Sequence, residues 1–94
     1  MEPHSNLVGP QIRKLRYQRE WSQSKLATKL QLAGFDISRS TVAKIESRIR
    51  WVPDWQLYYI ARALGVELAD LFPPLKPGDP QLHQQLKRCM TTRW

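Results

Sequence analysis

The sequence predicts an all-α fold, in which five helices form a compact domain and a sixth helix follows a spacer. Apolar residues recur at helical spacing over most of the chain, and no segment shows the alternation of a half-buried strand. Serine, proline and glycine stand where helices of this spacing start and stop.

Two serines mark the starts of neighbouring helices in the same way. Each follows an apolar residue, and a second apolar residue comes four positions later. This pattern is typical of an N-cap serine with a hydrophobic staple, which satisfies a backbone N–H and fixes the entry of the chain. The flanking pairs are Trp21 with Leu26 around Ser22, and Ile37 with Val42 around Ser38.

Two further signals bound the first three helices. The first helix is expected within 7–20, where Pro10 fits only in the opening turn. The second helix ends at Gly34, because glycine takes the left-handed conformation that stops a helix. The third helix covers 39–47.

The rest of the domain contains two shorter signals. Asp54 is expected to cap a fourth helix, whose core stripe ends before Gly65. A short fifth helix over 67–72 begins at Glu67, which is a weak cap.

The chain divides into three segments. Residues 1–6 form a polar lead, 7–72 form the helical domain, and 73–94 form a spacer and a tail. The spacer, 73–80, holds four prolines and a glycine. Apolar residues at helical spacing then predict a sixth helix that begins at Pro80 with Asp79 as its cap. These apolar residues are Leu82, Leu86 and Met90.

The charge balance favours a polyanionic partner. Lysine and arginine number 15 and aspartate and glutamate number 8, which gives a net charge of +7. Nucleic acid is the first candidate and an anionic membrane surface the second. Because there is one cysteine, no intrachain disulfide is expected. With no secretory signal and no apolar stretch long enough to span a bilayer, we expect a cytoplasmic protein without a membrane partner.

Enzymatic activity is the weakest interpretation of the sequence. The two histidines, His4 and His83, fall in the terminal segments. There is no Ser–His–Asp set, metal-ligand cluster or phosphate loop, so we expect no catalytic residues, no metal and no cofactor.

The third helix presents a low, basic outer face. Val42, Ile45 and Glu46 point to one side, and the opposite side carries small or basic residues. A helix with this profile can lie deep in the major groove of DNA, although an ordinary solvated face fits this helix alone equally well. The outward residues are Ser40, Ala43, Lys44 and Ser47, flanked by Arg39, Thr41 and Arg48.

The segments around this helix favour DNA. Gln23 is the first residue of the second helix, behind its Ser22 cap, where its amide and the backbone N–H groups suit a phosphate. Arg48 and Arg50, in the loop after the third helix, suit the same DNA backbone. Recognition helix, phosphate-binding helix start and basic loop occur in the order of a helix-turn-helix domain.

Together these residues resemble the Xre/Cro family of helix-turn-helix repressors. The likeness extends from about Val8 to Phe72, and it is specific because all of its parts occur in register. The matching residues are Ile12, Leu15 and Arg16; then Ser22, Gln23, Leu26 and Ala27; then 38–42, Ile45 and Glu46; then Pro53, Leu57, Ile60, Ala61, 64–66, Leu68, Leu71 and Phe72.

The resemblance implies a lambda-repressor-like five-helix domain that binds double-stranded DNA with its third helix. It implies a sequence-specific transcriptional regulator, with repression as the expected effect, that acts as a homodimer. Arg39, Ser40 and Lys44 would face bases, Thr41 a base or the backbone, and Gln23 a phosphate. Arg16 and Glu46 match positions that form a partly buried ion pair between the first and third helices.

Two departures from the family pattern affect the geometry. The interval from Leu26 to Ser38 is about five residues longer than is usual for the short turn of this motif. The extra residues, within 31–37, either lengthen the second helix or form a loop, with Phe35 as a candidate core residue. Arg48 stands where many members have glycine, which allows the third helix to run on.

The fourth helix carries more aromatic residues than its core stripe needs. Trp55, Tyr58 and Tyr59, with Arg62, are expected to point away from the core, and an exposed aromatic stripe needs a cover. The tail, in cis or swapped between copies, is the first candidate; a second copy and a different protein are the others. The last case would make the chain an antitoxin or accessory protein that combines DNA binding with a protein partner.

Overall fold

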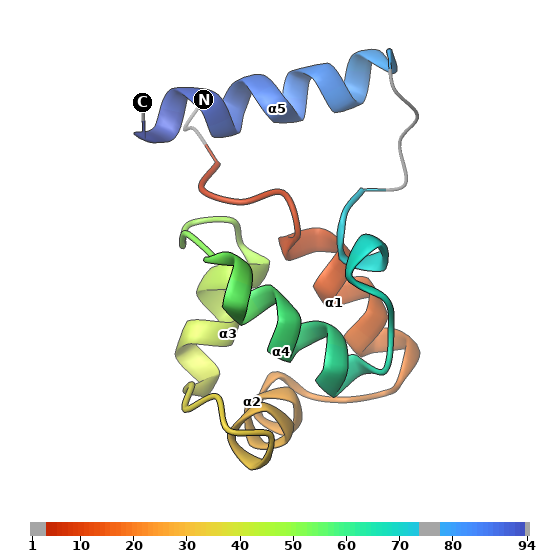
Figure 1. The fold of residues 1–94 in the computed structure, drawn as a ribbon, viewed down its shortest axis with the longest axis vertical. Helices are drawn as coiled ribbons and strands as arrows, with labels where there is room; N and C mark the ends of the chain where they lie inside the picture. The colour runs from red at the N-terminus through yellow and green to blue at the C-terminus, as the bar shows by residue number, and fades with distance from the viewer. Residues whose placement is uncertain (1–3, 74–77, 94) are drawn as a thin grey trace.

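The computed structural model describes residues 4–73 and 78–93, without the side chains of residues 82 and 91–93. The side chain of the predicted interface residue Leu82 and residues 74–77 of the spacer therefore lie outside the described part of the structure. The described chain contains helices and no strand, as predicted (Figure 1). The elements are α1 (Gly9–Gln18), α2 (Gln23–Leu32), α3 (Arg39–Glu46), α4 (Asp54–Leu64), the 3-10 turn η1 (Leu68–Leu71) and α5 (Pro80–Arg93).

Helices α1 to α4 and η1 enclose one hydrophobic core. In Figure 1, α4 runs across the front of the domain, α2 lies at the bottom and α5 crosses the top. Burial of these side chains is the main favourable term in folding. The most deeply buried ones come from all five elements: Ile12, Leu26, Leu30, Ile45, Ile60, Leu64 and Leu71.

Both serine caps predicted from the sequence are present. The Ser22 Oγ accepts a hydrogen bond from the Lys25 backbone N–H at 3.0 Å, and the Ser38 Oγ accepts one from the Thr41 N–H at 3.2 Å. Leu26 and Val42, the predicted staple residues, are buried. Each serine therefore satisfies a backbone donor of the first turn, and the starts of α2 and α3 are fixed locally.

The predicted cap of α4 is wrong. Asp54 is the first residue of the helix, and Pro53 occupies the N-cap position without a side-chain bond. The backbone of Pro53 is already extended, with ψ at 157°, so the helix starts one residue before the sequence suggests. The Asp54 carboxylate then lies in the first turn, where it complements the positive end of the helix dipole.

The long interval between α2 and α3 is mainly a loop. Helix α2 ends at Leu32, and Gly34 takes a φ of 107°. Phe35 then enters the core with 5% of its surface exposed, and Ile37 is also buried. The Gln31 side chain closes the loop by donating to the Ile37 carbonyl at 2.7 Å. Two buried side chains and one hydrogen bond thus hold the extra residues in place.

Helix α3 does not run on past its expected end. It stops at Glu46, and Arg48 adopts a φ of 66°. This left-handed conformation costs a non-glycine residue about 1–2 kcal/mol, so other contacts must hold Arg48 there. Those contacts involve the N-terminal segment and α5.

The aromatic residues of α4 are covered differently from the expectation. Tyr59 is half-buried against the core, and the rings of Trp55 and Tyr59 lie 5.4 and 5.9 Å from the ring of Phe35. The α2–α3 loop therefore covers one side of Trp55 and Tyr59. The tail does not shield Trp55 and Tyr58, which stay 53% and 50% exposed within the chain.

Asn6 belongs to the folded domain although the sequence places it in a polar lead. Its amide nitrogen donates to the carbonyls of Ile45 at 3.1 Å and Arg50 at 2.9 Å, and its Oδ1 accepts from the Gly9 N–H at 2.9 Å. The residue is only 8% exposed. One buried amide thus joins the start of α1 to the end of α3 and the loop that follows.

Gly9 allows the same two helices to approach closely. A Cβ atom at this position would lie 2.4 Å from the Ile45 carbonyl oxygen and 2.8 Å from that of Glu46. Both obstructing atoms belong to the backbone, so they cannot rotate away as a flexible side chain would. The start of α1 can therefore contact the end of α3 only if residue 9 has no side chain.

We expect Gly9→Ala to destabilise the protein by about 1–3 kcal/mol, the usual cost of forcing an extra carbon into a packed site. Without the clash, glycine to alanine inside a helix stabilises by about 0.5–1 kcal/mol, so even the sign is informative. Urea denaturation followed by circular dichroism measures the change. Ser24→Ala, at an exposed position in α2, is the control. Wild-type or higher stability of Gly9→Ala would contradict the close approach.

Candidate nucleic-acid interface

The two sides of α3 differ as the sequence predicts. Val42, Ile45 and Glu46 are buried, and Thr41 and Ala43 are half-buried. The outer side holds residues that combine low profile with positive charge. The exposed residues of this face are Arg39, Ser40, Lys44 and Ser47.

Three hydroxyl groups meet at the start of α3. The Ser38 Oγ lies 3.0 Å from the Ser40 Oγ and 3.0 Å from the Thr41 Oγ1. A hydroxyl both donates and accepts, so this cluster can match either kind of polar group on a ligand. The N-terminal end of the exposed face is therefore polar and adaptable, whereas Lys44 makes its other end cationic.

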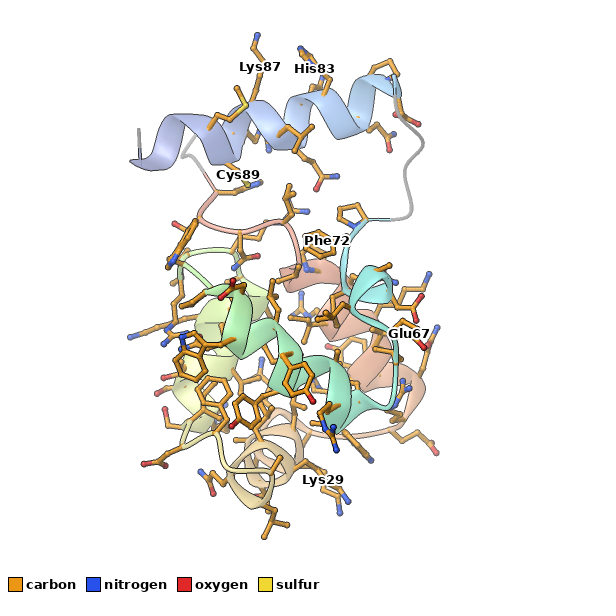
Figure 2. All side chains as sticks on the ribbon, in the orientation of Figure 1. Lys29, Glu67, Phe72, His83, Lys87 and Cys89 are labelled. Atoms are coloured by element: carbon orange, nitrogen blue, oxygen red, sulfur yellow. The ribbon has the colours of Figure 1, made fainter. Side chains whose placement is uncertain are left out.

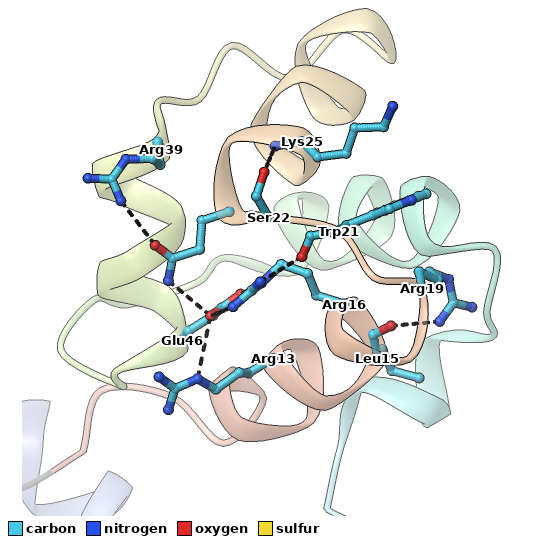
Figure 3. Close-up of polar contacts among 10 residues, drawn as sticks. Arg13, Leu15, Arg16, Arg19, Trp21, Ser22, Lys25, Arg39 and Glu46 are labelled. Carbon is cyan, nitrogen blue, oxygen red and sulfur yellow. Dashed lines mark hydrogen bonds and ion pairs between the residues drawn. The ribbon is translucent and has the colours of Figure 1, made fainter.

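A buried ion pair joins α1 to α3, as the sequence leads us to expect. Arg16 and Glu46 make two hydrogen bonds, Nε to Oε2 at 2.7 Å and Nη2 to Oε1 at 3.0 Å (Figure 3). Their side chains are 6% and 2% exposed. The bond to Glu46 raises the pKa of Arg16, and the remaining Nη1 donates to the Trp21 carbonyl at 2.7 Å. The pair is thus bidentate and tied to the chain between α1 and α2.

Gln23 extends this pair to the exposed surface. Its Nε2 donates to the Glu46 Oε1 at 3.1 Å, and its Oε1 accepts from the Arg39 Nη1 at 3.3 Å (Figure 3). One amide therefore connects the buried carboxylate to an arginine on the outer face of α3. The sequence indicates a phosphate contact for Gln23 and gives no sign of this connection to Arg39.

A polar hollow opens beside Gln23 at the start of α2. Arg13 lies at its side, with Nε 3.9 Å from the Glu46 Oε1 and 57% of its side chain exposed. The guanidinium groups of Arg13 and Arg16 lie 5.8 and 4.6 Å from the ring centre of Tyr17. The hollow suits an anion, because the exposed guanidinium groups of Arg13 and Arg39 lie beside a helix N-terminus, whereas that of Arg16 is held by Glu46. Its lining residues are Arg13, Arg16, Tyr17, Ser22, Gln23, Ser24 and Arg39.

Arg13 was missed as a site residue in the sequence, where it is one of several basic residues around the first helix. Arg13 precedes Arg16 by three residues, so the two side chains share a helix face. This spacing was the signal in the sequence that could have identified Arg13. Only the contact with α3 makes that face part of a site.

Arg48 does not point where the sequence predicts. Its Nη1 lies 2.8 Å from the His4 Nδ1, and its Nη2 donates to the Gln85 Oε1 of α5 at 2.8 Å. Burial lowers the pKa of Arg48, and burial together with Arg48 lowers that of His4. The left-handed turn directs the Arg48 side chain toward α5, so in this arrangement its guanidinium is engaged by His4 and Gln85 and not free for the predicted phosphate contact.

Arg50 also makes an internal contact. Its Nη1 donates to the Oε1 of Gln56 at 2.8 Å, and Gln56 is buried in the first turns of α4. The guanidinium of Arg50 is thereby fixed beside the start of α4, in the loop that follows α3.

The comparison with protein families agrees with this geometry. Residues 12–71 match the helix-turn-helix family. The chain belongs to this Xre/Cro-like helix-turn-helix family. The match begins inside α1, contains α2 to α4 and ends with η1, so it includes both serine caps, the buried ion pair and the exposed face of α3.

The chain is also similar in fold to several solved structures. The restriction-modification controller protein C.AhdI from Aeromonas hydrophila is 32% identical, with a TM-score of 0.61, over 70% of this chain and 91% of its own. A hypothetical transcription factor, NHTF from Neisseria, is 25% identical, with a TM-score of 0.64, over 85% and 80%. Hydroxypropylphosphonic acid epoxidase from S. wedmorenis is 25% identical, with a TM-score of 0.65, over 81% of this chain but only 38% of the enzyme. No curated protein matches the chain.

No helix among residues 4–73 and 78–93 is long and apolar enough to cross a membrane. Nor does this part of the chain hold a group of three or more residues suited to binding a metal ion.

We expect Glu46→Ala to destabilise the domain by about 3–5 kcal/mol, because it leaves the buried Arg16 cation without its partner. Chemical denaturation measures the loss. The double variant Arg16→Met/Glu46→Leu should recover most of the stability, since it removes both charges and retains apolar volume.

The control for this prediction is Asp36→Ala, which removes an exposed carboxylate from the loop between α2 and α3. Its effect should stay within about 0.5 kcal/mol. If Glu46→Ala were no worse than Asp36→Ala, the ion pair would not hold the helices together.

Proposed function

We propose that this protein is a sequence-specific DNA-binding transcriptional regulator that places α3 in the major groove. The observation that carries the proposal is the continuity of two surfaces. The exposed face of α3 adjoins the basic hollow at the start of α2, and Arg39 belongs to both. In duplex DNA the base edges in the major groove lie beside the phosphates. The exposed face of α3 would meet the bases while the hollow at the start of α2 meets a phosphate.

The proposed base contacts are those of the exposed α3 face. Arg39 and Lys44 suit the O6 and N7 acceptors of guanine, and the hydroxyls of Ser40 and Thr41 suit either kind of base edge. Gln23 holds Arg39 from the side, at 3.3 Å. We therefore assign Gln23 a second task, that of positioning Arg39 as it enters the groove.

The proposed phosphate contacts surround the start of α2. Ser22, Gln23 and Arg13 line the hollow there, and Arg50 lies in the loop after α3. Arg48 is left out of this group, because its guanidinium bonds His4 and Gln85. The positive end of α2 supports an anion at the same place.

Repression is the effect we propose, because occupancy of a DNA site is sufficient for it. Two copies would read half-sites about 34 Å apart, one turn of the double helix. The protein would act in the cytoplasm without a cofactor or catalytic activity. The likeness to the epoxidase, which involves 38% of that enzyme, is compatible with a shared DNA-binding-type domain alone.

A second candidate function rests on the exposed aromatic residues. Trp55 and Tyr58 stay about half exposed, and Arg62 lies 5.6 Å from the ring centre of Tyr58. Such a patch suits a protein contact, either with a second copy or with another protein. In the latter case the chain would be an antitoxin or accessory protein that also binds DNA.

Selection of binding sites from a random DNA pool tests the proposed function directly. A single enriched palindromic motif is expected, since it reports both specific reading and twofold symmetry. A motif without symmetry would support a monomeric reader, and the absence of any motif would favour the protein-interaction function.

We expect Arg39→Ala and Lys44→Ala each to weaken binding to the selected site by about 1–3 kcal/mol and to relax base preference. Fluorescence anisotropy with specific and random duplexes measures both effects. Lys25→Ala, an exposed charge on α2 outside the proposed contacts, is the matched control. Equal losses on the two duplexes would show that Arg39 and Lys44 are not base readers.

We expect Arg13→Gln to weaken all DNA sequences alike. The slope of log affinity against log salt should become shallower by about 0.9, the contribution of one phosphate contact. Arg62→Gln removes an exposed arginine from α4 and should leave the slope unchanged. A loss confined to the specific duplex would contradict the phosphate assignment of Arg13.

A further inference from the structure

An apolar hollow lies between α5 and the domain. It has a volume of about 270 Å³, and its walls include Leu7, Trp51, Phe72, Leu86 and Met90. The last four of these side chains remain 38–58% exposed. Figure 2 shows the setting, with Phe72 and Cys89 on facing sides of the gap below α5. These apolar side chains line the hollow without filling it, which makes the hollow a candidate ligand site.

A polar hollow of about 260 Å³ adjoins the apolar one, because Leu7 lines both. Lys14 and Arg48 supply its charge, and Gln81 and Gln85 of α5 supply amide groups. Among the described residues that line the two hollows there is no aspartate or glutamate. The seam under α5 therefore has an apolar part and a cationic part side by side.

Among the described residues of this seam, Arg48 has no anionic partner. Two of its nitrogens contact the neutral partners His4 and Gln85, and its Nε is buried without a hydrogen bond in the described structure. Desolvation lowers the pKa of Arg48 more than the neighbouring Cys89 raises it, and the nearby Arg88 lowers it further. An anion beside Arg48 would offset both effects, since a buried cation is stabilised by an opposite charge.

We propose that the seam under α5 binds a small amphipathic organic anion, with its apolar group against Trp51 and Phe72 and its carboxylate at Lys14 and Arg48. The size of the apolar hollow supports a group larger than one ring, because an apolar cavity of roughly 150 Å³ holds benzene. A carboxylate fits the charge, because guanidinium groups bind carboxylates through paired hydrogen bonds. The bound molecule would join α5 to the domain.

Octanoate is the probe, kept below its critical micelle concentration and titrated into the ¹⁵N-labelled full chain. We expect saturable shifts in the backbone signals of Trp51, Phe72 and α5. Octanol carries the apolar group without the charge, and acetate carries the charge without the apolar group. Each should bind at least about tenfold more weakly, the effect of losing one charged hydrogen bond or a comparable apolar contact.

Two variants locate the anion. Lys14→Gln and Arg48→Gln should each weaken octanoate binding about tenfold. Lys14 is exposed on α1, so its variant decides the matter if Arg48→Gln disturbs the fold. Lys25→Gln, on α2 and outside both hollows, is the control and should bind octanoate as the wild type does.

Three results would overturn the proposal. Octanol binding as tightly as octanoate would remove the anion from the recognition, and acetate binding as tightly would remove the apolar group. Octanoate shifts confined to the hollow beside Arg13 and Gln23 would place any binding at the other basic site. None of these measurements involves DNA, so the outcome is separate from that of the proposed function.

Discussion

The carboxylate of Glu46 is the group on which the placement of α3 depends. Arg16 from α1 and Gln23 from α2 both donate to it, and it is almost completely shielded from water. A buried carboxylate is tolerated only when its charge is paired and its lone pairs are used, so α3 has one angle at which this carboxylate is satisfied. Asn6 and Gly9 fix the same helix at its C-terminal end, through hydrogen bonds and through close approach. These contacts from α1, α2 and the N-terminal segment therefore fix the orientation of the exposed face of α3.

Features that depend on neighbouring residues were predictable from the sequence. The Ser22 and Ser38 caps need only a serine, a backbone N–H three residues on and an apolar staple, and all of these are visible in the sequence. The Arg16–Glu46 pair came from the family resemblance, since its members are thirty residues apart. The prediction that Asp54 caps α4 was wrong because the extended Pro53 occupies the N-cap position. Composition does not decide which of two adjacent residues becomes the N-cap.

Features that depend on distant backbone contacts were not predictable. Asn6 looks like part of a polar lead until the Ile45 and Arg50 carbonyls are placed beside it, and Gly9 looks like an ordinary helix-start glycine. Arg48 is basic and follows the recognition helix, which indicates DNA, yet its positive φ turns it toward α5. The contact of Phe35 with Trp55 and Tyr59 has the same explanation, because it depends on the path of the loop between α2 and α3, and loop paths are weakly encoded by local sequence.

The single cysteine can report whether α5 is docked on the domain. Cys89 is the one cysteine, it lies half-buried at the inner side of α5, and burial raises the pKa of its thiol. Thiolate is the form that reacts with alkylating reagents, so we expect this sulfur to react slowly while α5 is docked. Displacement of α5 from the domain would expose the thiol and would be expected to speed its alkylation. The alkylation rate of Cys89 would therefore measure how often α5 leaves the domain, without any added label.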